Sequence, residues 1–483
     1  MSESWQLKID LNSAAANRFK DQLDSGNFTV LIESPLPGDE VDQDSACEQL
    51  RQLEQAVLGQ TETPAALAIL DRGRNTRRRA AELITALDAE QLDRHVMYLS
   101  GADTDLGTAE ALAKVAVNAG CRNIVAVSGS ADPDWDAKEC RRHQFSESTM
   151  LLRMLSRLQL PVQIGCTINP FSYRAYPLLG QYYKLVKKLQ LGAGFVVTQA
   201  GWDMLKMQSL SWYLLRRNLY YPTLARLILL TPERVEKLAA GREPGILISA
   251  DFAKILAREM RYSKNQFEAA QYRRLELQAA GCRLLGYSGV QISGAELPGK
   301  AKLVLHRIGQ ALKNYPDFNT WLEEYNSYMA SAEMAPFSDT FQLFDQYLRR
   351  DYPLEAPPAM RELDLPRLGS AEKLLLGARR LLLSGSAGNQ PEHLHLLKLL
   401  LAGCRNCRSC RLTEREFVCP EHCPKRLADG PCGGVGPDGS CELGNFECIH
   451  AKIVRFAHAQ GHLPELENQL VEQSPACGGD PQR

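Results

Sequence analysis

Eight short apolar runs, each followed by a longer amphipathic stretch, constrain the fold of this 483-residue chain more than any other feature. The runs are continuously apolar, as is typical of parallel strands covered on both faces. They lie at 28–33, 66–71, 95–100, 123–129, 162–168, 195–199, 224–230 and 283–290. Between them, 106–119 and 173–191 have helical patterns. Eight repeats of strand and helix predict an α/β fold, a (β/α)8 barrel, and an open doubly wound sheet is the alternative.

In such barrels the chemistry lies at the carboxyl ends of the strands. Most residues at these ends are small or carry an amide, which suits hydrogen bonding to a flat heterocycle. They are Glu33, Asp71, Ser100, 128–132, 167–169, 199–203, Thr231 and Gly289. Glu33 could act as a proton donor, because burial disfavours the charged form of a carboxyl group; a structural carboxylate paired with Lys or Arg is the alternative. No G-x-G-x-x-G follows any run and no Walker motif is present, so a Rossmann site is not predicted.

A second constraint is the density of cysteines near the C-terminus. Eight of the 14 cysteines are Cys404, Cys407, Cys410, Cys419, Cys423, Cys432, Cys441 and Cys448. The start MSESWQLKID has no secretory pattern, so we expect a cytoplasmic protein whose thiolates bind metal, and a disulfide framework is the alternative. The i, i+3, i+6 spacing of the first three resembles the ligands of a [4Fe–4S] cluster, whereas Cys419 and Cys423 are spaced like a zinc pair. We favour iron–sulfur over zinc; a metal that only folds a small domain is the competing interpretation.

The composition of the chain excludes some partners, and its changes along the sequence indicate the domain boundaries. The net charge of −1 gives no case for nucleic acid or a membrane surface, and no apolar run approaches about 18 residues, so no membrane span is expected. We expect an extension at 1–27, the barrel at 28–312, a helical bridge at 313–400 that includes a helix at 339–350, a cysteine-rich metal-binding domain at 401–462 and a flexible tail at 463–483. Cys477 in that tail is expected to be a free thiol, and an oligomer is compatible with the sequence.

The cysteine motifs carry a family resemblance. CRNCRSCRLT, FVCPEHCPK, ADGPCGG and PDGSCE, followed by a last Cys, resemble the C-terminal cysteine-rich domain associated with methylenetetrahydrofolate reductases. The barrel motifs are similar to the same family. IESPLP at 32–37 resembles the segment that holds the family's general acid, which implies that role for Glu33, and TQ in 191–203 implies that Gln199 binds folate.

The resemblance also implies a flavin site, with FAD favoured over FMN. Its expected contacts are His95, Ser128, Gly129, Ser130, Asn169, Lys187 and Lys188, with Ser130 also beside the folate. The chain departs from the family at 128–130, where Ser-Gly-Ser replaces Arg-Gly-Asp.

The implied activity is the flavin-dependent reduction of 5,10-methylenetetrahydrofolate to 5-methyltetrahydrofolate, in one-carbon and methionine metabolism. NAD(P)H or a reduced electron-carrier protein would supply the electrons, the latter through the cysteine domain. Two alternatives remain open: a folate-binding barrel that hands on a methyl group without reducing it, and an electron-transfer or assembly module for which the barrel is a platform.

Overall fold

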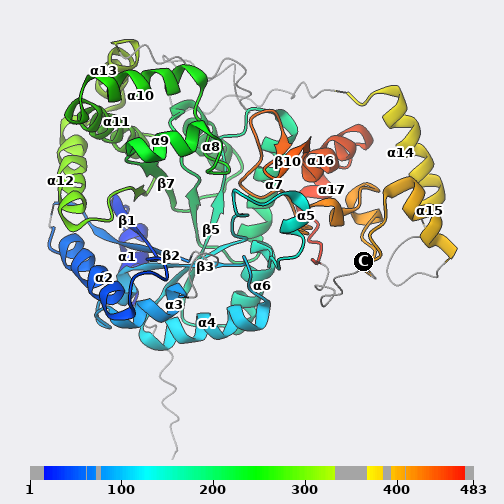
Figure 1. Cartoon of the computed structure of the whole chain (residues 1–483), viewed down its shortest axis with the longest axis horizontal. Coiled ribbons are helices and arrows are strands. Elements are labelled where there is room, and N and C mark those ends of the chain that lie inside the picture. Colours follow the sequence, from blue (N-terminus) through cyan, green and yellow to red (C-terminus); the bar gives the residue numbers. More distant parts are fainter. Residues whose placement is uncertain are drawn as a thin grey trace, which may run out of the picture.

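The computed structural model describes residues 16–60, 62–71, 78–331, 367–384, 393–407 and 409–473. A barrel forms one side of the molecule, and the C-terminal part of the chain lies against it (Figure 1). The predicted helix at 339–350 and Cys477 lie outside the described residues. No helix in the described ranges is long and apolar enough to cross a bilayer.

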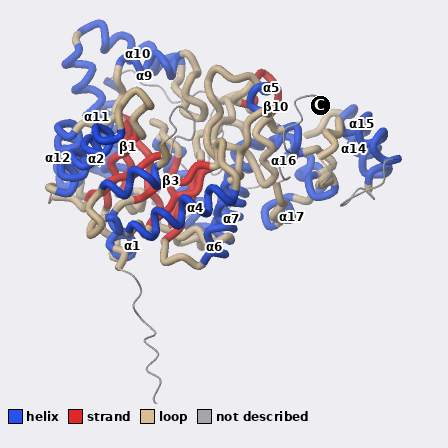
Figure 2. The backbone as a smooth tube through the Cα atoms, turned by 60° about the horizontal axis from the view of Figure 1, so that its bottom comes forward, coloured by secondary structure: helices blue, strands red, loops and turns tan. Residues whose placement is uncertain are grey.

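Eight parallel strands close into the predicted barrel in sequence order, with β1 pairing to both β2 and β8. The strands are β1 Thr29–Pro35, β2 Ala65–Leu70, β3 Val96–Ser100, β4 Asn123–Val127, β5 Gln163–Ile168, β6 Phe195–Thr198, β7 Thr223–Ile228 and β8 Gly289–Ser293. The strands lie inside the ring of helices (Figure 2). Both faces of each strand are therefore covered, which explains the continuous apolar runs.

Helices follow the strands and cover them. Through the barrel they are α1 Arg18–Asp24, α2 Gln43–Leu58, α3 Ala80–Leu83, α4 Leu106–Ala119, α5 Ala137–Cys140, α6 Ser148–Leu158, α7 Ala175–Gln190, α8 Met204–Arg216, α9 Pro232–Ala239, α10 Ala250–Tyr262, α11 Lys264–Leu284 and α12 Pro298–Asn314. The helix predicted at 106–119 coincides with α4, which begins at the N-cap Asp105 and ends at Gly120 in the left-handed region.

The eighth strand was predicted too early in the sequence. The run 283–290 contains the last turn of α11, and Leu285 caps that helix, so β8 begins only at Gly289. A short apolar run at the end of a buried helix has the same pattern as a buried strand, and pattern alone does not separate them. The carboxyl end of β8 is consequently Ser293, and Gly289 lies at the opposite end.

The boundaries of the barrel and the tail also differ from expectation. Phe19 of α1 is fully buried and packs edge-on against Phe195 at 5.3 Å between ring centroids, so the barrel begins before residue 28. At the other end, α17 Leu463–Asn468 packs on α7, and Val471 is buried, so residues 463–473 are part of the folded C-terminal region.

The C-terminal region is small and rich in loops. After α13 Phe318–Ser331 come α14 Ser370–Leu383 and α15 His393–Ala402, which pack on each other at the edge farthest from the barrel (Figure 1). The cysteine-rich stretch follows, with a hairpin of β9 Ser440–Cys441 and β10 Gly444–Glu447 and then α16 Ile449–Gln460. Helices α16 and α17 both pack on α7 of the barrel.

A fully buried carboxylate fastens the C-terminal region to the barrel. Glu147, which precedes α6, accepts hydrogen bonds from Lys184 Nζ on α7 at 2.7 Å and from the backbone N–H of Ala428 at 2.6 Å and of Asp429 at 3.1 Å. Burial raises the pKa of Glu147, but the charge of Lys184 and these hydrogen bonds outweigh burial and hold the pKa below its ordinary value. The carboxylate is therefore charged at neutral pH and fully bonded.

Replacing Glu147 by Gln should weaken this junction strongly. The amide cannot neutralise buried Lys184, and its NH2 group would face two N–H donors, so we expect a loss of about 3–5 kcal/mol. Chemical denaturation followed by tryptophan fluorescence measures it. Glu110→Gln, which breaks the exposed pair Glu110–Lys114, is the control and should cost about 0.3–0.5 kcal/mol. Equal costs for the two variants would contradict the assignment.

Candidate functional site

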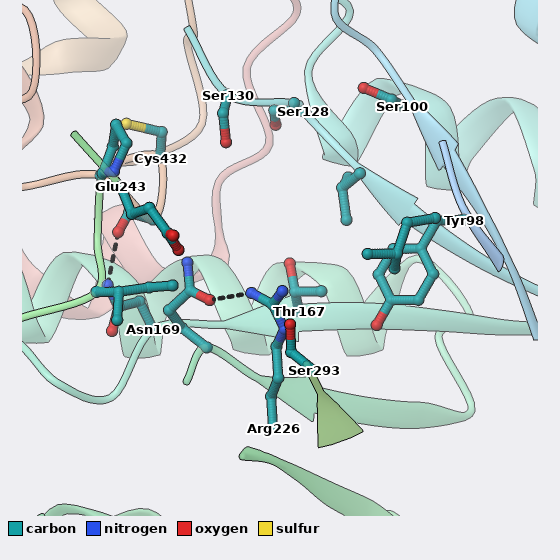
Figure 3. Close-up of a pocket in the computed structure, with 18 of the residues that line it drawn as sticks. Tyr98, Ser100, Ser128, Ser130, Thr167, Asn169, Arg226, Glu243, Ser293 and Cys432 are labelled. Carbon is teal, nitrogen blue, oxygen red and sulfur yellow. Dashed lines mark hydrogen bonds between the residues drawn. The ribbon is translucent and has the colours of Figure 1, made fainter. Parts of the chain in front are cut away.

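A cavity of about 890 Å³ opens at the carboxyl ends of the barrel strands. Its floor carries side chains from β1, β3, β7 and β8, and Figure 3 shows Tyr98, Arg226 and Ser293 there. The C-terminal region supplies a further wall, made of Lys425, Pro431, Cys432, Gly433, Gly434 and Glu442. The cavity thus lies at the carboxyl ends of the strands, where the site was expected, but the barrel alone does not enclose it.

A chain of hydrogen bonds crosses the cavity floor. Arg226 binds both carboxylate oxygens of Glu33, with Nη2 to Oε2 at 2.9 Å, and its Nη1 donates to Gln199 Oε1 at 2.8 Å. Gln291 Nε2 donates to Glu33 Oε1 at 2.7 Å, and Tyr98 donates its O–H to Gln291 Oε1 at 2.7 Å. The predicted acid and the predicted folate-binding amide are therefore linked through one guanidinium group.

This arrangement corrects the expectation that Glu33 is protonated. Burial raises the pKa of Glu33, but the charge and hydrogen bonds of Arg226, with those of Gln291 and Ser293, outweigh it and leave the pKa below its ordinary value. Glu33 is a carboxylate paired with arginine in this structure, which was the alternative interpretation of the sequence.

The structure brings most of the predicted flavin contacts to the cavity. Ser128, Gly129, Ser130 and Asn169 line it, as do Lys188 and Gln199. Lys188 donates to Thr167 O at 2.6 Å, and burial lowers its pKa to about 8. These backbone, hydroxyl and amide groups, with a cation close by, fit the polar edge of an isoalloxazine ring.

Two predicted contacts lie elsewhere. His95 precedes β3, at the amino end of the barrel, where Nδ1 accepts from Leu67 N at 3.1 Å and Nε2 lies 2.8 Å from Glu54 Oε1. Lys187 points away from the cavity and binds Asp429 O at 3.2 Å. Neighbouring residues on a strand or helix face different directions, so a motif match alone did not separate Lys187 from Lys188.

A glycine-rich segment at 430–434 (GPCGG), which we call the finger, accepts hydrogen bonds from polar side chains of α7 and from Asn169, which follows β5. Lys184 Nζ binds the carbonyls of Gly430 and Pro431, Gln181 Nε2 binds Cys432 O at 2.6 Å, and Asn169 Nδ2 binds Gly433 O at 2.5 Å. A Cβ on Gly245, which has φ +79°, would lie 2.0 Å from Gly433 O, so that close approach requires glycine.

The cysteines form two neighbouring sets. The thiols of Cys423, Cys432, Cys441 and Cys448 line one small cavity. Burial first, and then their mutual repulsion, raises the pKa of Cys441 and of Cys448 to about 12. Likewise, burial and nearby Cys407 and Cys404 raise the pKa of Cys419 to about 12. Cys410 follows in the same loop.

The donor set of four thiols around one cavity suits a thiolate-bound metal. The sulfurs are neighbours, but no three His, Cys, Asp or Glu side chains in the described ranges gather at ligand distance. No disulfide joins the described cysteines. Cys432 belongs to this set and also lines the barrel cavity, so the two sites share a wall.

Sequence reasoning missed Arg226, Gln291 and the pair formed by Lys425 and Glu442. Arg226 could have been found, because it is the one charged residue inside the apolar run 224–230. Lys425 and Glu442 are buried, form an ion pair, and Lys425 donates to Gly129 O at 3.1 Å. Nothing local in the sequence indicates that these two residues reach the barrel.

Comparisons with known proteins follow the same division of the chain. Residues 18–212 match the family model for methylenetetrahydrofolate reductase, and residues 390–475 match the one described as methylene-tetrahydrofolate reductase C terminal. A search of curated proteins found no match.

Two solved structures are similar at a distance. An uncharacterized protein from Clostridium thermocellum, described as binding two copies of 5-methyl-5,6,7,8-tetrahydrofolic acid, is 11% identical with a TM-score of 0.45, over 60% of this chain and 99% of that one. A putative dihydrodipicolinate synthetase from Pseudomonas aeruginosa is 14% identical with a TM-score of 0.28, over 58% and 99%. Both are too distant to bear on function.

Substituting one cysteine in each set should show that the two thiol sets bind metal independently. Cys448→Ser should remove the metal of one set and Cys419→Ser that of the other, so that each variant keeps about half of the bound metal and the double variant keeps none. Metal analysis after anaerobic purification measures this, with Cys47→Ser on α2 as the control. Full metal content in both single variants would contradict the assignment.

Proposed function

Since the chain belongs to the methylenetetrahydrofolate reductase family and carries that family's C-terminal domain, we propose that it reduces 5,10-methylenetetrahydrofolate to 5-methyltetrahydrofolate with a bound flavin. The observation that carries the proposal is the hydrogen-bonded chain from Glu33 through Arg226 to Gln199 at the cavity floor. It supports an acid and a heterocycle-binding amide held side by side at the strand ends, where barrel enzymes have their active sites.

Each residue has a part in this chemistry. The proton donor is Glu33, which protonates N10 so that the bridge opens to an N5 iminium; it must first gain a proton, because Arg226 keeps it ionised. Gln199 can donate to and accept from the pterin edge. Ser128, Ser130, Asn169 and Lys188 would hold the flavin, which supplies hydride to the iminium carbon when bound.

The C-terminal region binds polar side chains of α7 beside the proposed flavin site. Gln181 and Lys184, which face the cavity from α7, are bonded to carbonyls of the finger. Lys187 is bonded to Asp429. The lysine pair expected to contact the flavin is thus reduced to Lys188, which still supports flavin binding.

A second candidate function is folate binding without reduction. Ser130 stands where the family has aspartate, and Arg226 neutralises Glu33. Both observations favour a barrel that binds folate and hands its methyl group to a partner protein. The absorption spectrum of the purified protein separates the two functions: a flavin band supports the reductase, and the absence of a flavin band supports the alternative.

Glu33→Gln should abolish reduction and leave the fold and flavin content unchanged. The amide keeps the shape and the contact with Arg226 but has no proton to give, so turnover with methylenetetrahydrofolate should fall about 10²–10⁴-fold. Glu54→Gln is the matched control, because Glu54 is also a buried carboxylate but is bonded to His95 outside the cavity. Turnover of the Glu33 variant within a few-fold of the original protein would exclude Glu33 as the acid.

We also propose that the cysteine domain is the entry for single electrons. A thiolate-bound iron–sulfur centre at Cys432 would place such electrons against the wall of the cavity, which supports a reduced carrier protein as donor, with NAD(P)H as the other source.

Replacing Cys407 and Cys410 by Ser, in the set farther from the cavity, should abolish reduction of the flavin by a low-potential donor and leave reduction by NADH intact. Stopped-flow absorbance measures both rates on protein of equal flavin content. If both rates persist while only stability falls, the metal holds the domain together and does not carry electrons.

A further inference from the structure

We propose that Arg226 is a positioning residue that controls the protonation of Glu33: it keeps the carboxylate ionised before a ligand binds, and a ligand carbonyl that accepts a hydrogen bond from its guanidinium lets Glu33 bind a proton. This inference deepens the proposed function and rests on it for the identity of the ligand. It makes the acid available only when a heterocycle with the right edge has entered the cavity.

The geometry makes the pair asymmetric. The side chain of Glu33 is 2% exposed and lies on β1, held by Gln291 from β8, whereas that of Arg226 on β7 is 20% exposed and faces the cavity. The short side chain of Glu33 is enclosed by the barrel wall, whereas the longer side chain of Arg226 has room to move toward a ligand. Separation of the pair would therefore come from movement of Arg226.

The groups around Glu33 leave it dependent on this one cation. Gln291 and Ser293 approach from β8 and Tyr98 from β3, and all three are neutral at physiological pH. Glu243 faces Arg226 but is paired with Arg234, and Asp71 at the end of β2 is paired with Arg79. Within the described ranges, Arg226 is the only cation paired with Glu33.

Burial determines what happens when that cation moves away. Burial is the largest influence on Glu33 and favours the neutral form, and Arg226 provides the main opposition. Without the guanidinium, a carboxyl in this position takes a proton from solvent. Gln291 keeps its orientation, since its carbonyl oxygen accepts from Tyr98, and continues to donate to Glu33 Oε1. Oε2 of Glu33, which Arg226 Nη2 has then left, carries the proton.

The second partner of Arg226, Gln199, indicates the chemistry of the ligand. Nη1 of Arg226 donates to Gln199 Oε1, which also accepts from Ala200 N at 3.0 Å. A ligand edge with an N–H beside a carbonyl can give the N–H to Gln199 Oε1 and receive the guanidinium on the carbonyl. The oxo-bearing edge of a pterin has this pattern, and a heterocycle without the carbonyl would leave Arg226 on Glu33.

Proton uptake on binding tests the inference. We expect titration calorimetry of 5-methyltetrahydrofolate at pH 7, repeated in buffers of different ionisation enthalpy, to show uptake of about one proton per ligand. Glu33→Gln should bind without uptake. Arg226→Met should also bind without uptake, because Glu33 is already protonated. Arg79→Met removes another arginine that is paired with a carboxylate at the end of a barrel strand, Asp71, and it should retain the uptake.

Binding of 5-methyltetrahydrofolate without proton uptake by the unaltered protein would overturn the inference, whatever the variants do. Failure to bind folate at all would instead contradict the proposed function. The role of Arg226 is then tested without ligand, by infrared spectroscopy at pH 7. A protonated-carboxyl band in Arg226→Met that disappears in the double variant with Glu33→Gln supports it, and its absence from a folded Arg226→Met protein overturns it.

Discussion

The contact between Glu147 and the backbone of Ala428 and Asp429 is the interaction on which the arrangement of this molecule depends. A fully buried carboxylate must be bonded on every side, and here one partner comes from the barrel and two come from the C-terminal region. Lys184 completes the set from α7 and continues to the carbonyls of the finger. The same network therefore holds the C-terminal region and places residues 430–434 in the mouth of the barrel.

The cavity is consequently built by two regions that are far apart in the sequence. The barrel supplies the floor, where Glu33, Arg226 and Gln199 are linked, and the finger supplies a wall that includes Cys432. Because Cys432 also faces the other thiols of its set, a structural change at those thiols would directly alter the wall of the cavity. This shared wall gives a physical reason for joining a cysteine-rich domain to a barrel that already has a large core of its own.

Much of the fold could be predicted, because local patterns specify it. Seven of the eight apolar runs match observed strands to within two residues at each end, and the helix at 106–119 was predicted to the residue. The run 283–290 failed because the end of a buried helix is as apolar as a strand. In the site, Ser128, Ser130, Asn169, Lys188 and Gln199 reach the cavity as predicted, since they follow strands or lie on the facing helix. His95 and Lys187 do not, because a short motif does not specify which way a side chain faces.

The sequence by itself determined the closed parallel barrel, the rim on which the site lies and the density of thiols, because hydrophobic periodicity and residue spacing are local properties. Only the tertiary structure decided the charge of Glu33, because Arg226 meets it from a strand nearly 200 residues later. It also decided that Cys423, Cys432, Cys441 and Cys448 form one set and that the finger enters the barrel. Electrostatics and burial depend on what surrounds a group in space, and those neighbours are brought together only by the fold.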